Sequence, residues 1–94
     1  MNRIALNNKA SRELNKLFSE KGVRWCELQL SKCNNFCLSY AHRHKRRWYY
    51  DKPDHLLWDH DQVAISCANC HEMIEKNKEL TESTFLRVRG EEKI

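Results

Sequence analysis

Glycine, proline and long apolar runs are all scarce in this 94-residue chain, which contains two glycines and one proline. No run of about 18 apolar residues is present, so we expect no membrane-spanning helix and no membrane partner. The N-terminal segment MNRIALNNKASREL has no continuous apolar stretch and no small-residue cleavage site, so we expect no secretory signal. We therefore predict an intracellular protein whose thiols stay reduced.

Cysteine and histidine are abundant by contrast, with five of each. An odd number of cysteines suits a disulfide framework poorly. A chain of this length is expected to form one domain, residues 1–94, and to bury only about 60% of the surface that its unfolded state exposes. In a reducing compartment, a bound metal is the expected way to stabilise so small a core.

The net charge of +4 is unevenly distributed along the chain. Residues 1–52 contain 12 basic and 4 acidic side chains, whereas residues 53–94 contain 5 basic and 9 acidic ones. The basic half ends in a run that directly precedes three aromatic residues and comprises Arg43, His44, Lys45, Arg46 and Arg47. A basic run beside aromatics favours a nucleic-acid surface, although a solvated loop that only keeps the protein soluble has the same composition.

Hydrophobic periodicity predicts the order of the secondary-structure elements. A helix is expected over residues 8–21, in an N-terminal segment 8–22, with Asn7 or Asn8 as its N-cap and Gly22 as its stop. The rest is expected as a strand at 36–42, a long polar connection at 45–61, a strand at 62–67, a helix at 68–80, and a tail at 81–94 whose residues 81–89 form a helical turn or a strand. Two strands are too few for a parallel sheet, so the fold class is a small α+β unit.

Four of the cysteines can form one metal site if the loop between the first two folds back. Cys67 and Cys70 form a C-x2-C knuckle, and Cys26 and Cys33 precede it at a wider separation. Four thiolates from two loops can form a closed tetrahedral site for a structural Zn²⁺. Cys37 is the spare cysteine, either packed in the core or replacing Cys33 as a ligand. The alternative is that all five are reduced core cysteines.

The histidines fall into two groups around this knuckle. His42 and His44 end the first predicted strand and point to one side if that strand stays regular. His71 opens the last predicted helix, and Glu75 lies at i+4 on the same helix face, at a separation that allows both to coordinate a cation. Glu75 is equally compatible with a solvated surface charge.

These residues together resemble a known family. The segments Cys26-Glu27, Cys33, Ala41-His42-Arg43-His44 and VAISCANCHEMIE at 63–75 are similar to those of HNH endonucleases, in particular the small zinc-stapled type common in bacteriophages. The resemblance covers roughly residues 25–80. It implies a ββα-metal (His-Me finger) unit, in which two strands and a helix surround one catalytic divalent cation: Mg²⁺, Mn²⁺, Ni²⁺ or Zn²⁺.

The resemblance also implies roles for the histidines at the strand end. His42 matches the family's first histidine and would be the general base. Many members place an Asp or His ligand immediately before that base, where this chain has Ala41. His44 would then have to complete the coordination sphere, which leaves base and ligand interchangeable between His42 and His44.

On the helix side, the resemblance makes His71 a ligand of the catalytic cation and Glu75 a further one. The family's central Asn falls at Gln62, whose amide would orient the base on a longer arm. Such a site would hydrolyse DNA phosphodiesters to a 5′ phosphate and a 3′ hydroxyl. A neutral histidine can accept a proton from water near pH 7, and a cation can stabilise the charged phosphate.

DNA is the expected partner, with the basic run neutralising its phosphates through Arg43, Lys45, Arg46 and Arg47. A larger phage or host protein that targets the chain to its substrate is a further expected partner, in the cytoplasm of a bacterial host if the chain is phage-encoded. The alternative function is a noncatalytic zinc-finger module that binds DNA through the same loop and knuckle.

Overall fold

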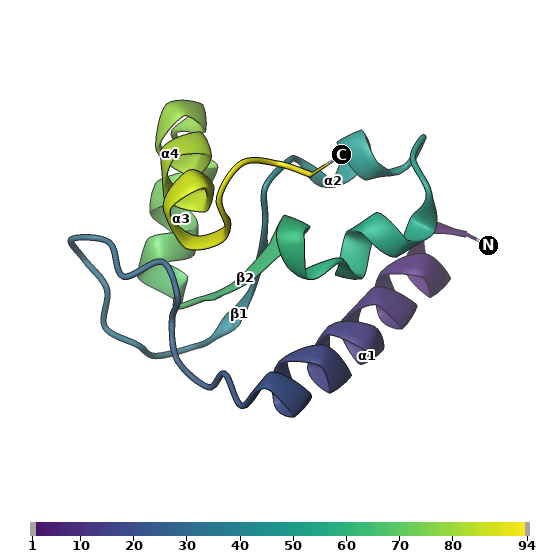
Figure 1. Ribbon diagram of the computed structural model, residues 1–94, viewed down its shortest axis with the longest axis horizontal. Helices are drawn as coiled ribbons and strands as arrows, with labels where there is room; N and C mark the ends of the chain where they lie inside the picture. The colour runs from purple at the N-terminus through teal and green to yellow at the C-terminus, as the bar shows by residue number, and fades with distance from the viewer. Residues whose placement is uncertain (1, 94) are drawn as a thin grey trace.

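Two short antiparallel strands lie between the helices in the computed structural model, which describes residues 2–93 (Figure 1). Strand β1 (Ser39–His42) pairs with β2 (Val63–Ser66), so that Ser39 lies opposite Ser66 and His42 opposite Val63. This confirms the small α+β class. No helix within residues 2–93 is sufficiently long and apolar to cross a membrane.

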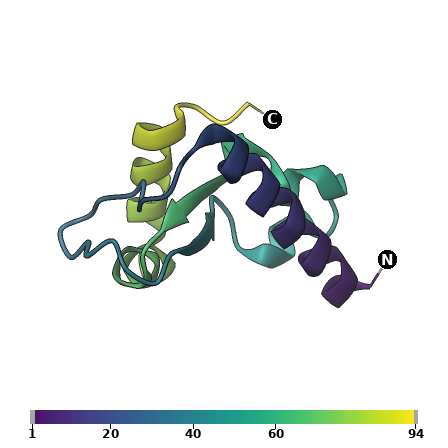
Figure 2. The same ribbon diagram turned by 90° about the horizontal axis from the view of Figure 1, so that it is seen from below.

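Helices cover both faces of this sheet (Figure 2). Because side chains alternate along a strand, Ala41 and Ala64 face one core, which they share with the cysteine loop and the C-terminal helices. Tyr40 and Ile65 face the other side, where they pack with Phe18 of the N-terminal helix. The sheet therefore joins two cores.

The N-terminal helix α1 (Arg3–Lys21) begins five residues earlier than the sequence predicts. Its N-cap is Asn2, whose side chain accepts a hydrogen bond from the Ala5 backbone N–H at 2.8 Å, so the predicted caps at Asn7 and Asn8 are wrong. The helix ends at Gly22, which adopts the left-handed conformation as expected (φ 71°). Its buried face is made by Leu6, Ala10, Leu14 and Phe18.

The predicted polar connection at 45–61 is in fact packed rather than structureless. It contains helix α2 (Arg46–Tyr49) and the 3₁₀ turns η1 (Asp54–Trp58) and η2 (His60–Gln62). The side chains that anchor it against the first half of α1 are fully or nearly fully buried: Tyr49, Leu56 and Leu57. Isolated apolar residues in a polar segment, with no periodicity, gave no signal for these short turns.

The single helix predicted at 68–80 is two helices, α3 (Ala68–Glu75) and α4 (Lys78–Arg89). Asn77 has an extended backbone and accepts a hydrogen bond from the Leu80 N–H at 3.0 Å, so it ends one helix and caps the next. The tail segment 81–89 is therefore helical. Phe85 of α4 is buried in the same core as Ile74 of α3.

The first strand is also shorter than predicted. Residues 36–38 do not join the sheet, because the backbone turns at Asn35 and Cys37, which have positive φ angles of 60° and 54°. Phe36 is 70% exposed, and Cys37 is exposed as well. The alternation of Phe36 with Leu38 imitated a strand in a segment whose backbone turns.

Candidate functional site

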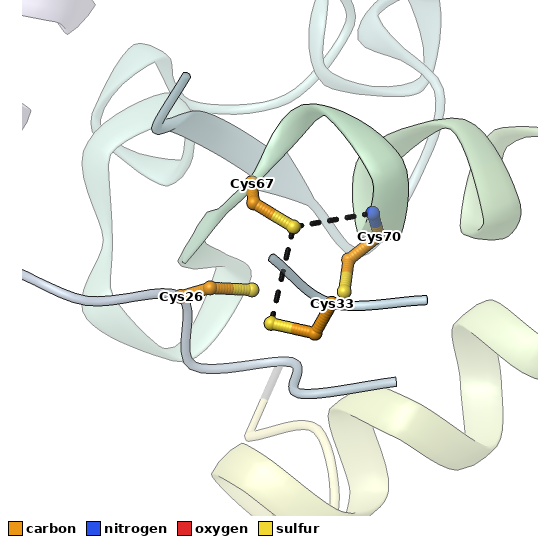
Figure 3. A group of neighbouring side chains, drawn as sticks. All are labelled: Cys26, Cys33, Cys67 and Cys70. Carbon is orange, nitrogen blue, oxygen red and sulfur yellow. Dashed lines mark hydrogen bonds between the residues drawn. The ribbon is translucent and has the colours of Figure 1, made fainter. Parts of the chain in front are cut away.

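Four cysteine sulfurs converge beside the start of α3 (Figure 3). The Sγ atoms of Cys26, Cys33, Cys67 and Cys70 all lie within 4.8 Å of one another, and those of Cys33 and Cys67 are 3.9 Å apart. A tetrahedral Zn²⁺ with Zn–S bonds of about 2.3 Å separates its sulfurs by about 3.8 Å. The predicted residues therefore fit a structural zinc ion, and among the described residues they are the one group of three or more that can hold a metal.

The loop and the helix bring these sulfurs together by local hydrogen bonds. Asn35 Oδ1 accepts from the Cys26 backbone N–H at 2.6 Å, and the Cys33 N–H donates to the Leu30 carbonyl at 2.9 Å, which folds the loop back on itself. The Glu27 N–H donates to the Ile65 carbonyl at 2.8 Å and ties the loop to β2. The six-residue spacing is therefore compatible with one site.

Backbone N–H groups point at two of the sulfurs. The Leu30 N–H donates to Cys70 Sγ and the Cys70 N–H donates to Cys67 Sγ, both at 3.4 Å. Burial raises the pKa of the Cys67 thiol, but N–H donors from Cys70 and Asn34 outweigh it and bring that pKa down to about 6. Burial raises the pKa values of Cys33 and Cys70. N–H donors favour the thiolate form that binds zinc.

Cys37 lies outside this cluster. Its side chain is exposed on the turn that precedes β1, and it belongs neither to the core nor to the group of converging sulfurs. The structure thus favours Cys33 over Cys37 as the fourth ligand.

A groove along the β1 edge gathers most of the other predicted residues. It has a volume of about 830 Å³ and runs between the end of β1, helix α2 and helix α3. Its lining includes His42, His71, Glu75 and the whole basic run 43–47. Gln62 is the one predicted catalytic residue that does not line it.

His42 is held in one orientation within this groove. Its Nε2 lies 2.9 Å from the Leu57 carbonyl oxygen, which can only accept, so Nε2 carries the proton and Nδ1 keeps its lone pair. The rings of His42 and Tyr49 meet edge to face, with their centroids 5.4 Å apart. Burial lowers the pKa of His42 to about 4, with smaller contributions from the nearby charges of Arg46 and His71. The imidazole is therefore neutral at pH 7.

His71 and Glu75 form the pair that their spacing predicts. His71 Nε2 lies 3.2 Å from Glu75 Oε1, and His71 Nδ1 lies 3.1 Å from the Ser39 hydroxyl. Adjacent ligands of a divalent cation, at about 2.1 Å from it, are separated by about 3.0–3.4 Å. The distance of 3.2 Å between His71 Nε2 and Glu75 Oε1 thus fits two neighbouring ligands of one cation. It is also the length of an ordinary hydrogen bond.

The structure does not bring His44 to this pair. His44 Nε2 donates to Glu92 Oε2 at 2.7 Å, and its ring stacks on Trp48 at 3.9 Å. Ala41, at the position where the family supplies a further ligand, is fully buried in the core. Of the three ligands predicted for a catalytic cation, only His71 and Glu75 lie together.

Gln62 and Arg43 occupy structural positions. Gln62 is fully buried; its Oε1 accepts from the Tyr49 hydroxyl at 2.9 Å and its Nε2 donates to Glu92 at 2.7 Å. The Arg43 side chain is only 9% exposed, with Nε donating to the Asp61 carbonyl at 2.8 Å and Nη2 to the Gly90 carbonyl at 2.5 Å. Arg43 is therefore not available for a phosphate, and three exposed residues of the predicted set remain: Lys45, Arg46 and Arg47.

Two residues that contact the site were missed by sequence reasoning: Ser39 and Glu92. Ser39 contacts a residue 32 positions away and Glu92 contacts one 48 positions away, so no local sequence pattern predicts either contact.

Comparisons of the chain with protein-family models, with curated proteins and with solved structures find no match.

Proposed function

We propose that this chain is a metal-dependent HNH-type DNA endonuclease, with a zinc-stapled ββα unit formed by β1, β2 and α3. The observation that carries the proposal is that one groove is lined by a neutral histidine at a strand end, a His–Glu pair on the following helix and a run of exposed cations. The sequence resemblance supports the same arrangement of strand, strand and helix.

The chain's own groups supply the base. With Nε2–H bound to the Leu57 carbonyl, Nδ1 of His42 is free to accept a proton from a water molecule that attacks the phosphorus. Because burial keeps His42 unprotonated above about pH 4, the base is available at neutral pH. A divalent cation held by His71 and Glu75 would supply stabilisation of the negative charge on the phosphate and the leaving oxygen.

DNA binding falls to the end of the basic run. Lys45, Arg46 and Arg47 are exposed and line the groove beside His42. Each can neutralise one backbone phosphate and release its counterion, so that affinity falls steeply with salt. Such contacts carry no sequence information, which leaves room for a larger phage or host protein that selects the target.

One observation favours a second candidate, a noncatalytic zinc module that binds DNA. The methyl group of Ala41 stands where a further ligand is expected, and His44 is taken up by Glu92. Two protein ligands must then hold the cation with waters and a phosphate oxygen. If two protein ligands do not retain that cation, the cysteine cluster and the exposed basic residues still support DNA binding without hydrolysis.

A plasmid cleavage assay separates the two candidates. Zinc-loaded chain is incubated with supercoiled plasmid and Mg²⁺, Mn²⁺, Ni²⁺ or added Zn²⁺, alongside His42→Ala, His71→Ala and the control His55→Ala. We expect cleavage by the wild type and by His55→Ala, whose exposed side chain lies outside the groove. The other two variants should lose at least about 100-fold in rate while still binding DNA. Binding without cleavage under every metal would establish the noncatalytic module instead.

A further inference from the structure

The segment after α4 runs back across the molecule toward α2 (Figure 1). It is fixed on both sides of Glu92. The Gly90 carbonyl accepts from Arg43 Nη2 at 2.5 Å, and the Lys93 N–H donates to Asp61 Oδ2 at 3.1 Å. Backbone groups therefore fix this segment on both sides of Glu92, so the place of its carboxylate does not depend on the hydrogen bonds of its own side chain alone.

The carboxylate of Glu92 accepts two hydrogen bonds at one oxygen. Gln62 Nε2 and His44 Nε2 each donate to Oε2 at 2.7 Å. Gln62 is fully buried, so Glu92 is the acceptor that satisfies an otherwise enclosed amide N–H. The Glu92 side chain itself is 30% exposed, so it can be replaced without opening the core.

From Gln62 the contacts continue to the general base of the proposed nuclease. Gln62 Oε1 accepts from the Tyr49 hydroxyl at 2.9 Å, and that hydroxyl in turn accepts from the His44 backbone N–H at 3.2 Å. Tyr49 is 1% exposed, and its ring meets the His42 ring edge-on at 5.4 Å. A change at Gln62 is thus transmitted to the ring that packs on His42.

We propose that Glu92 is a positioning residue for His42, acting through Gln62 and Tyr49. An amide side chain has two orientations that differ in which of its atoms faces a partner. A carboxylate accepts only, so Glu92 compels the NH₂ group to face it and turns Oε1 of Gln62 toward Tyr49. His44 becomes the anchor of this C-terminal segment, which leaves His42 as the base. This inference rests on the proposed function for its catalytic consequence, but the contacts are independent of it.

The test compares the zinc-loaded full chain with Glu92→Ala, Glu92→Gln and the control Glu91→Ala, an exposed neighbouring carboxylate. Nitrogen-15 NMR of the imidazoles near pH 7 reports the His42 tautomer, and plasmid cleavage at saturating metal gives kcat and KM. We expect the wild type and Glu91→Ala to show His42 protonated at Nε2 alone. Glu92→Ala should loosen the Tyr49 ring and so shift the His42 ring signals, while the Leu57 carbonyl keeps the proton on Nε2, and it should lower kcat about 10-fold with KM unchanged. Glu92→Gln keeps an oxygen that can accept from Gln62 and should recover most of kcat.

The possible outcomes are distinct. Unchanged His42 signals and unchanged kcat in Glu92→Ala would overturn the inference, as would an equal change in Glu91→Ala. A purely structural role would lower the melting temperature and leave the His42 signals and kcat as they are. If the wild type cuts no DNA but Glu92→Ala still shifts the His42 signals, the nuclease proposal fails and the positioning of His42 by Glu92 stands.

Discussion

The imidazole Nε2 of His42 donates to the carbonyl oxygen of Leu57 over 2.9 Å, which joins the end of β1 to the turn η1. This contact links the candidate catalytic group to a segment that is polar in sequence but anchored by a fully buried leucine. Local stability and the tautomer of the base therefore depend on the same turn.

Truncating that anchor should show that the connection is part of the core. Leu57→Ala removes a side chain with no exposed surface, so we expect it to lower the free energy of unfolding by about 2–5 kcal/mol. Leu86→Ala, at a leucine that is 55% exposed, is the matched control and should change it by less than about 0.5 kcal/mol. Urea unfolding followed by circular dichroism measures both, and equal effects would mean that the connection is not packed.

The cysteine cluster should determine whether the chain folds. We expect one tightly held zinc per chain by metal analysis, and loss of cooperative thermal unfolding when a strong chelator removes it. Cys67→Ser should lose both zinc and structure, whereas Cys37→Ser, at the exposed cysteine outside the cluster, should keep both. An unchanged melting curve for Cys67→Ser would show that zinc bound by the cysteine cluster does not stabilise the fold.

Burial of His42 should make stability depend on pH. The unfolded histidine titrates near 6.5, whereas the folded one has its pKa lowered to about 4, so between these values only the unfolded state binds the proton. Stability should fall by up to about 3 kcal/mol as the pH drops from about 6.5 to about 4.

Zinc release at low pH adds to that fall, so the comparison needs His42→Asn. This variant shares the cysteine cluster but lacks the titrating ring. We expect denaturant unfolding at a series of pH values to show a shallower loss for His42→Asn than for the wild type. Parallel curves would show that His42 is not buried as described.

The DNA affinity of single variants should distinguish the exposed cations, which bind phosphates, from Arg43, which stabilises the fold. Arg47→Gln should weaken duplex binding uniformly across sequences and reduce the slope of log affinity against log salt by about 1. Lys32→Gln, an exposed lysine outside the groove, should leave the slope unchanged. Arg43→Gln should mainly destabilise the fold, because Arg43 donates to the Asp61 and Gly90 carbonyls. Fluorescence anisotropy titrations at several salt concentrations make the comparison.

What the sequence predicts well is what local chemistry determines. The C-x2-C knuckle lies at a helix N-terminus, where Cys67 caps α3 with its sulfur, so spacing alone identified this half of the cluster. His71 and Glu75 meet because four residues make about one helical turn. These relationships hold in any fold that keeps the helix.

The sequence does not predict a feature for which two residues are equally suitable, or one that depends on a contact between residues far apart in the chain. Asn2 and Asn7 are both good N-caps, and hydrophobic spacing cannot choose between them. The apolar pattern of α3 continues past Asn77, which hides the break between the two C-terminal helices. Glu92 meets Gln62, which lies 30 positions away in sequence, only because the segment after α4 folds back against η2.

If His42 accepts a proton during hydrolysis of DNA, a small base supplied from solution should replace the ring that His42→Ala lacks. Plasmid cleavage by zinc-loaded His42→Ala is measured with and without added imidazole, at a DNA concentration that saturates binding, beside His71→Ala. The account predicts that imidazole restores a measurable part of the wild-type rate to His42→Ala and none to His71→Ala. A His42→Ala variant that cuts DNA at the wild-type rate without imidazole would contradict it.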